Sequence, residues 1–152
     1  MEALQFDALG ELLTGIVLMI IASMKLGISY TVGSVLLMIL AFIFGTVIYS
    51  AIKIAGAALA LWIKSSGSIL QVLYMSSDFA KYPVTIYNGA VRNIITYILP
   101  FAFTAYYPAS YILRGNNPWF CFGAGTVIAT VLLTLSVLLW NKGISAYESA
   151  GS

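Results

Sequence analysis

The chain has 152 residues, of which 61% are hydrophobic and 8% are charged, and its formal net charge is +2. This composition lies outside the range of soluble globular domains and predicts an integral membrane protein. A bilayer core of about 30 Å takes roughly 20 helical residues to cross, so residues 1–152 are expected to form a single all-α membrane domain with about four spans.

The sequence carries little material for catalysis. It has no histidine and one cysteine, Cys121, so one chain supplies neither a disulfide nor a His/Cys metal cluster. A phosphate-binding loop of the Gly-x-x-x-x-Gly-Lys-Ser/Thr type is absent. The basic residues stand singly, which argues against a nucleic-acid surface. We therefore expect no enzyme activity, no cofactor and no nucleic-acid partner, with the lipid bilayer as the surroundings of the chain.

The first two predicted spans are residues 12–28 and 31–62. The first is short, and Lys25 would extend its aliphatic stem along the apolar stretch towards the surface. The second is too long for one crossing. It either forms a single helix that protrudes, with Lys53 near the interface, or breaks near Lys53. A lysine at the bilayer centre costs about 3 kcal/mol on insertion scales, which favours the single helix with Lys53 near the interface.

Two further spans are expected at residues 66–82 and 119–140. The second is the clearer one, because it is free of charge and has a tryptophan at each end, as an interfacial aromatic belt predicts. Lys142 follows directly, and a basic residue beside the last span favours a cytoplasmic C-terminal tail, residues 141–152.

Between these spans the stretch "YPVTIYNGAVRNIITYILPFAF" predicts an amphipathic helix that begins beside Pro83 and is interrupted at Pro100. Its polar side is expected to hold Thr85, Asn88, Arg92, Asn93 and Thr96. With Pro108 as a second break, residues 84–113 could form a proline-broken re-entrant hairpin. Broken backbone at membrane depth needs protein or a water-filled cavity around it, which hints at a transport path.

A plainer interpretation explains the hydropathy equally well. A proline-kinked span over residues 93–113 would follow a cytoplasmic loop over residues 64–92. This arrangement also places more basic residues on one side of the membrane. The residues alone leave both models open.

The segments "FAKYP", "ILPFAF" and "YYPASYIL", with "YESAGS" at the C-terminus, resemble the permease subunits of type-2 ABC exporters, in particular a bacterial branch with six spans. The resemblance covers nearly the whole chain and corresponds to the C-terminal part of such a permease. Residues 12–28, 31–62, 66–82 and 119–140 would be spans three to six. The family's re-entrant hairpin before the last span favours the broken-hairpin model over residues 84–113.

The resemblance implies a permease subunit or a truncated permease fragment in the bacterial plasma membrane. It would pair with a second permease chain and be driven by a separate ABC ATPase subunit. Another protein could supply the first two spans. The alternative is a structural or regulatory membrane protein that derives from such a permease and does not transport.

Candidate site residues follow from charge, aromatic character and small size. Candidates for a substrate path or gate are Asp78, Arg92, Phe101, Phe103, Tyr106 and Tyr107. Asp78 is also expected to pair with Lys81. Candidates for helix packing or dimer contacts are Gly45, Gly56 and Gly125. Glu148 is a candidate contact for a cytoplasmic partner.

Overall fold

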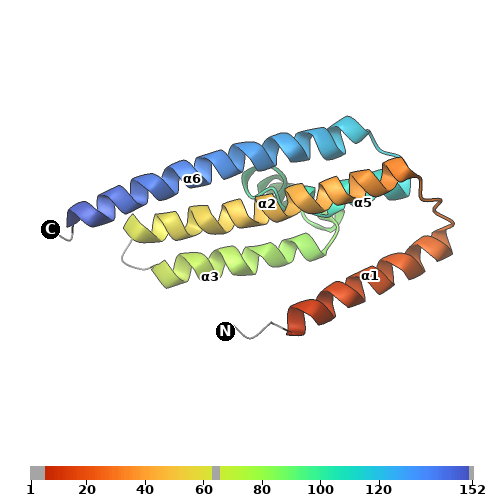
Figure 1. Cartoon of the computed structure of the whole chain (residues 1–152), viewed down its shortest axis with the longest axis horizontal. Helices are drawn as coiled ribbons and strands as arrows, with labels where there is room; N and C mark the ends of the chain where they lie inside the picture. Colours follow the sequence, from red (N-terminus) through yellow and green to blue (C-terminus); the bar gives the residue numbers. More distant parts are fainter. Residues whose placement is uncertain (1–5, 63–65, 151–152) are drawn as a thin grey trace. The chain divides into compact units, whose positions relative to one another are not determined.

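The computed structural model describes residues 6–62 and 66–150, and Figure 1 shows their course. These residues form helices and turns, without a strand among them, as the composition predicts. The chain divides into two compact units, Met1–Val32 and Gly33–Ser152, and each is described by itself.

The first unit contains one helix, α1 (Phe6–Leu26). It begins earlier and ends earlier than the predicted range 12–28. Gly27, with φ +63°, ends it in the left-handed conformation that glycine adopts without a steric penalty. Its apolar part, Leu12–Leu26, is shorter than 18 residues.

Two long apolar helices dominate the second unit. Helix α2 (Val32–Trp62) continues through Lys53 without a break, so the single long helix expected over residues 31–62 is confirmed. A π-helical segment, η5 (Trp119–Ala124), leads directly into α6 (Gly125–Ala150). The helix therefore runs ten residues beyond the predicted end at Trp140 and includes most of the expected tail. Residues 151–152 of that tail lie outside the described residues.

Helices α2 and α6 run in the same direction (Figure 1). Gly125 at the start of α6 lies against the Phe44 ring, and Gly143 near its end lies against Ala58 and Leu61. The two contacts advance along both helices together, which fixes a parallel register. The chain between them must consequently return to the end where α2 begins.

The return starts with α3 (Ser66–Ser77), which spans about 18 Å at 1.5 Å per residue. A short 3₁₀ turn, η1 (Asp78–Lys81), continues it. Tyr82 then adopts an extended conformation, because the ring of Pro83 disfavours helical geometry in the residue before it. The helical segment thus ends one residue before the predicted limit at 82.

The predicted amphipathic helix after Pro83 is broken into three pieces. A 3₁₀ turn, η2 (Val84–Ile86), is followed by α4 (Gly89–Asn93) and a π-helical turn, η3 (Ile94–Ile98). The Asn88 side chain accepts a hydrogen bond from the Val91 N–H at 2.9 Å and caps α4, rather than belonging to a polar stripe. The same irregularity turns Thr96 inward, where it is 2% exposed, so its predicted place on the polar side is wrong.

Pro100 ends this limb as predicted, and the second limb follows at once. It consists of the 3₁₀ turn η4 (Phe101–Phe103) and α5 (Tyr106–Arg114). Pro108 does not break α5, contrary to the expectation. It occupies the first turn, where backbone N–H groups have no helical partner and proline is tolerated. Val84 and Ile95 of the first limb pack against Ala102 of the second, so the two limbs fold onto one another.

One face of α2 forms the main core of the second unit. Its buried side chains recur at helical spacing (Ala41, Phe44, Ile48 and Ile52), and they meet Phe101, Phe103, Cys121, Phe122 and Ala129. The other face of α2 is equally apolar but exposed, with Phe42 71% accessible. An apolar helix with one apolar face left open is suited to a lipid environment.

Gly125 at the start of α6 faces the buried Phe44 ring of α2, so a methyl group there should be costly. A Cβ at this position would lie 2.8 Å from two ring carbons of Phe44, which is itself buried. We expect Gly125→Ala to lower stability by about 1–3 kcal/mol through overpacking, measured by thermal unfolding in mild detergent. Gly123→Ala is the matched control, because its Cβ would meet only Trp119 at 3.8 Å. Equal stability of the two variants would contradict the close packing.

Candidate functional site

A groove beside α2, with a volume of about 530 Å³, has hydroxyl groups and lysines in its lining. We call it the α2–η1 groove. It is lined from α2 by Phe42, Gly45, Thr46, Tyr49, Ser50 and Lys53, and from the opposite wall by Ala80, Lys81, Thr104 and Ala105. Hydroxyl groups and two lysines therefore face one space along an otherwise apolar helix.

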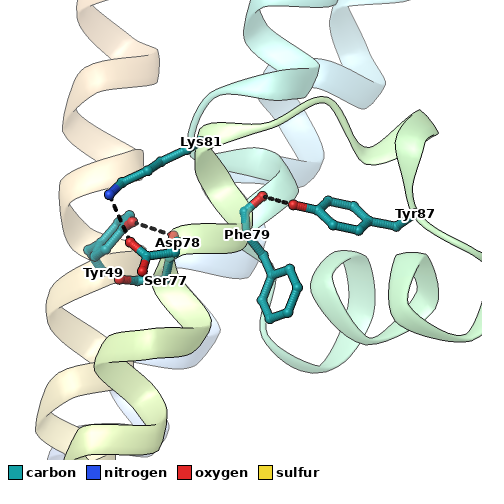
Figure 2. Close-up of polar contacts among 6 residues, drawn as sticks. All are labelled: Tyr49, Ser77, Asp78, Phe79, Lys81 and Tyr87. Atoms are coloured by element: carbon teal, nitrogen blue, oxygen red, sulfur yellow. Dashed lines mark hydrogen bonds and ion pairs between the residues drawn. The ribbon is translucent and has the colours of Figure 1, made fainter.

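One hydrogen bond ties the two walls together (Figure 2). The Tyr49 hydroxyl donates to the Ser77 carbonyl at 3.2 Å, joining α2 to the last residue of α3. Directly after it, Lys81 Nζ lies 2.8 Å from Asp78 Oδ1, which confirms the predicted pair. A second bond, from the Tyr87 hydroxyl to the Phe79 carbonyl at 3.5 Å, attaches the following segment to η1.

Lys53 belongs to two concavities. Its Nζ lies 6.0 Å from the centroid of the Tyr49 ring, on the side of the α2–η1 groove. The same residue lines a smaller apolar groove of about 410 Å³ between α2 and α6, together with Ile54, Ala57, Val137 and Trp140. Gly143 lies against Ala58, so Trp140, three residues earlier on α6, lies near the level of Ala57 on α2. Lys53 precedes Ala57 by about one helical turn, or about 6 Å along α2.

A third concavity of about 260 Å³ separates η1 from α5. Lys81 and Tyr106 line it, and Arg114 stands at its end. Of the predicted path residues, Tyr106 faces this third groove. Asp78 lies next to the α2–η1 groove, because it is paired with Lys81, which lines that groove. Lys81 connects the two spaces.

Other predicted path residues lie elsewhere. Phe101 and Phe103 are each 1% exposed and form part of the core. Tyr107 is half-buried and packs on Phe103, with ring centroids 4.6 Å apart. Arg92 is exposed on α4 and lines none of these three grooves. None of these four residues lines the groove that Tyr106 faces, although the Tyr107 ring contacts the Tyr106 ring, with centroids 5.3 Å apart.

The predicted glycines mainly serve packing within the chain. A Cβ at Gly45 would come 3.2 Å from the Thr104 carbonyl oxygen, so this glycine lets the second limb approach α2. Gly125 admits the Phe44 ring, and Gly56 is buried. The side chain of Glu148 lies outside the described residues, so its predicted contact stays a prediction.

Sequence reasoning missed Tyr49 and Gly143. Tyr49 is one of ten tyrosines, and its partner is 28 residues away, so nothing in the local pattern distinguishes it. Gly143 follows the charged Lys142 and was assigned to the tail. Gly143 could have been identified if the last helix had been extended beyond Trp140, because a glycine within a helix indicates a close contact with a neighbour.

Two apolar helices of span length and the family comparison together indicate an integral membrane protein. Val32–Leu61 and Trp119–Ser145 are long and apolar enough to cross a membrane. The family model of the ABC-2 family transporter proteins matches residues 1–151, and the chain belongs to this family. It is thus a membrane transport component of the permease type. Comparison with curated proteins and with solved structures found no match.

The bond between Tyr49 and Ser77 should matter more to stability than the charged pair beside it. We expect Tyr49→Phe to lower stability by about 1 kcal/mol, because the hydroxyl is partly buried and joins two helices. Asp78→Asn should change it by less than about 0.5 kcal/mol, since both side chains of that pair are mostly exposed. Thermal unfolding in mild detergent would measure both.

Tyr111→Phe is the matched control for Tyr49→Phe. Tyr111 is also half-buried, and it contacts Phe122 through its ring. Removing the hydroxyl in Tyr111→Phe should leave the stability of the protein nearly unchanged. A similar loss in both tyrosine variants would show that the Ser77 contact contributes nothing specific.

Proposed function

We propose that the chain is the transmembrane permease subunit of an ABC exporter in a bacterial plasma membrane. The observation that carries this proposal is the family match over residues 1–151. Support from the geometry comes from the α2–η1 groove, which places Lys53, Lys81 and several hydroxyl groups along an apolar bundle. Ionisable groups at such a position are a functional-site hypothesis by default in a membrane protein.

In the proposed topology α2 and α6 cross the membrane in the same direction. The apolar part of α1, within residues 12–28, and the segment 66–82 supply the other crossings, in correspondence with spans three to six of the family. α3 covers only about 18 Å, less than the apolar thickness of roughly 30 Å. The residues after Lys81 must complete that return.

Residues 84–113 complete it as a broken re-entrant hairpin in the half of the membrane where α6 begins. Its two limbs pack on one another through Ile95 and Ala102, and its interruption lies at Pro100. The interrupted stretch, Pro100 to Phe103, is buried throughout. This is the protection that irregular backbone requires at membrane depth, and it supports the hairpin over the plain kinked span.

Basic residues support a cytoplasmic C-terminus. Lys142 follows Trp140 on α6, Lys53 lies one turn from that level, and Lys81 shares a groove with Lys53. Lys142 and Lys53 thus lie towards the end of the bundle where α2 and α6 finish, as the positive-inside preference requires. Lys81 comes at the end of the returning segment 66–82, on the opposite side in this topology, against that preference.

Energy would come from a separate ABC ATPase subunit, and a second permease chain would complete the substrate path. In this arrangement the α2–η1 groove faces the path, with Asp78 and Lys81 as its gate and Tyr106 beyond them. Arg92 and the buried Phe101, Phe103 and Tyr107 would line the path only after the two limbs separate. Glu148, near the end of α6, would contact the ATPase subunit.

Cysteine accessibility tests the topology. In a Cys121→Ala background, Asn116→Cys should react with an impermeant thiol reagent from outside intact cells. Lys142→Cys should react only in inverted vesicles, because it lies towards the opposite end of α6. The wild-type chain is the control, since Cys121 is buried. Labelling of positions 116 and 142 from one side would contradict a membrane crossing by α6.

A pull-down tests the proposed function. The chain, with a small C-terminal tag in its native host, should co-purify with an ATP-binding cassette subunit in mild detergent. Vesicles containing both proteins should hydrolyse ATP faster than the ATPase alone. The Gly125→Ala variant reports whether recovery depends on the folded bundle.

Recovery of a further membrane protein with the complex would identify a chain that supplies additional spans. A folded, inserted chain that binds no ATPase subunit would overturn the proposal. That result would favour the alternative of a structural or regulatory membrane protein.

A further inference from the structure

The last turn of the first limb differs from the helix that its sequence pattern predicts. Val91, Ile95 and Ile98 are spaced four and three residues apart, which would place them on one face of an α-helix. In the structure this stretch ends in the π-helical turn η3, whose wider turn moves Ile98 off that face and leaves it 69% exposed. The sequence pattern and the observed turn therefore describe two different registers for the same residues.

Thr96 shows what the π-helical register costs. Its side chain is 2% exposed, and its hydroxyl has no hydrogen-bond partner among the described residues. On the regular α-helices of this chain, the hydroxyls of Thr46, Thr126 and Thr130 donate to the carbonyl four residues earlier. An α-helical turn would offer Thr96 the same bond, to the Arg92 carbonyl. The observed register thus carries a penalty that the α-helical register would remove.

Contacts within and between the limbs favour the observed register. The Leu99 N–H donates to the Ile94 carbonyl at 2.8 Å, which closes the π-helical turn. Ile95, in the same turn, packs against Ala102 of the second limb. The π-helical register is therefore supported by contact with the other limb, whereas the α-helical register is supported by the sequence pattern of the first limb.

We propose that residues 94–98 alternate between the π-helical register seen in this structure and an α-helical register. In the second register Thr96 turns outward and Ile98 joins the buried face. Because Pro100 connects this turn directly to η4, the change moves the second limb away from η5. Segments in which local sequence preference and structure disagree are expected to be strained or functional. The proposal concerns the chain alone and depends neither on an ATPase partner nor on transport.

The single cysteine, Cys121, reports movement of the second limb. It is 1% exposed on η5, and its Sγ lies 3.9 Å from the Ser110 Oγ on α5. A small uncharged maleimide, added in excess to the protein in mild detergent, should therefore modify Cys121 only when α5 leaves η5. The mass of the intact protein gives the rate of this modification.

A second thiol reports unfolding of the whole bundle. Ser136 is 1% exposed on α6, seven residues from both Ala129 and Gly143, which face α2. In a Cys121→Ala background, the thiol introduced by Ser136→Cys should react only when α6 separates from α2. We expect Cys121 of the wild-type chain to react at least about tenfold faster, because local opening requires less free energy than global unfolding.

Two variants that favour the π-helical register should slow the modification of Cys121. Thr96→Val removes the buried hydroxyl and keeps the branched shape, so we expect a rate about tenfold lower. Ile98→Thr removes apolar surface that only the α-helical register buries, so we expect a rate about fivefold lower. The matched control is Ile86→Thr, because Ile86 is 62% exposed on η2 of the same limb and should leave the rate unchanged.

The Ile98→Thr result decides between one register and two. With a single π-helical register this exposed side chain has no influence on opening, so an unchanged rate overturns the proposal. Equal slowing by Ile98→Thr and Ile86→Thr also overturns it, as do equal rates at Cys121 and at the thiol of Ser136→Cys. If Thr96→Val fails to fold, Ile98→Thr and its control still give the answer. A failed pull-down with the expected rates would remove the exporter assignment and leave the two registers standing.

Discussion

The parallel contact between α2 and α6 is the constraint on which the rest of the second unit depends. Gly125 leaves room for the Phe44 ring at one end of the contact, and Gly143 lies against Ala58 and Leu61 at the other. In lipid there is no hydrophobic force to bring apolar helices together, so close van der Waals packing at small residues is the available source of stability. Once the two helices are parallel, every residue between them serves the return path.

The return path concentrates both irregularity and burial. The π-helical turn before Pro100 and the 3₁₀ turn after it leave backbone groups without regular helical partners. These turns lie against the α2 core through Phe101, which packs on Tyr49 with ring centroids 5.3 Å apart. The buried Thr96 hydroxyl has no hydrogen-bond partner among the described residues. A buried hydroxyl without a partner is unfavourable, so Thr96 is a local cost within this part of the fold.

The threonine hydroxyls of α6, unlike that of Thr96, are all satisfied by hydrogen bonds within a regular helix. Thr126, Thr130 and Thr134 each donate to the carbonyl four residues earlier, at 2.8–2.9 Å. Such bonds satisfy a hydroxyl inside its own helix, without a partner from another element. The helix can therefore face lipid while carrying threonines, and its polar content says nothing about a path.

The sequence was sufficient for features that local chemistry decides. The absence of charge over residues 31–52 predicted one long helix, Pro83 and Pro100 marked real boundaries, and the spacing of Asp78 and Lys81 predicted their pair. Thr96 was misplaced because periodicity assumes one helical geometry throughout, and the turn type changes three times between Val84 and Phe103. Pro108 was taken for a break, but it lies in the first turn of α5, where proline is tolerated.

The candidate site could be predicted only in part, because its contacts join residues far apart in the chain. Asp78 and Tyr106 were found by their charge and aromatic character, but Tyr49 reaches Ser77 across 28 residues. The direction of α6 relative to α2 decides that contact, and spacing along one helix does not encode it. Phe101 and Phe103 resemble path residues in sequence, yet each is only 1% exposed and belongs to the core.

Charge placement links the fold to its proposed use. A single lysine within an apolar bundle is expensive, and its cost falls when a long stem carries the ammonium group towards water or a counter-charge. The α2–η1 groove offers Lys53 both a polar wall and the neighbourhood of Asp78, although Asp78 already contacts Lys81. Lys53 also lines the apolar groove between α2 and α6 that contains Trp140. Because the contact that makes α2 and α6 parallel also forms that groove, the packing of the two helices determines the surroundings of this lysine.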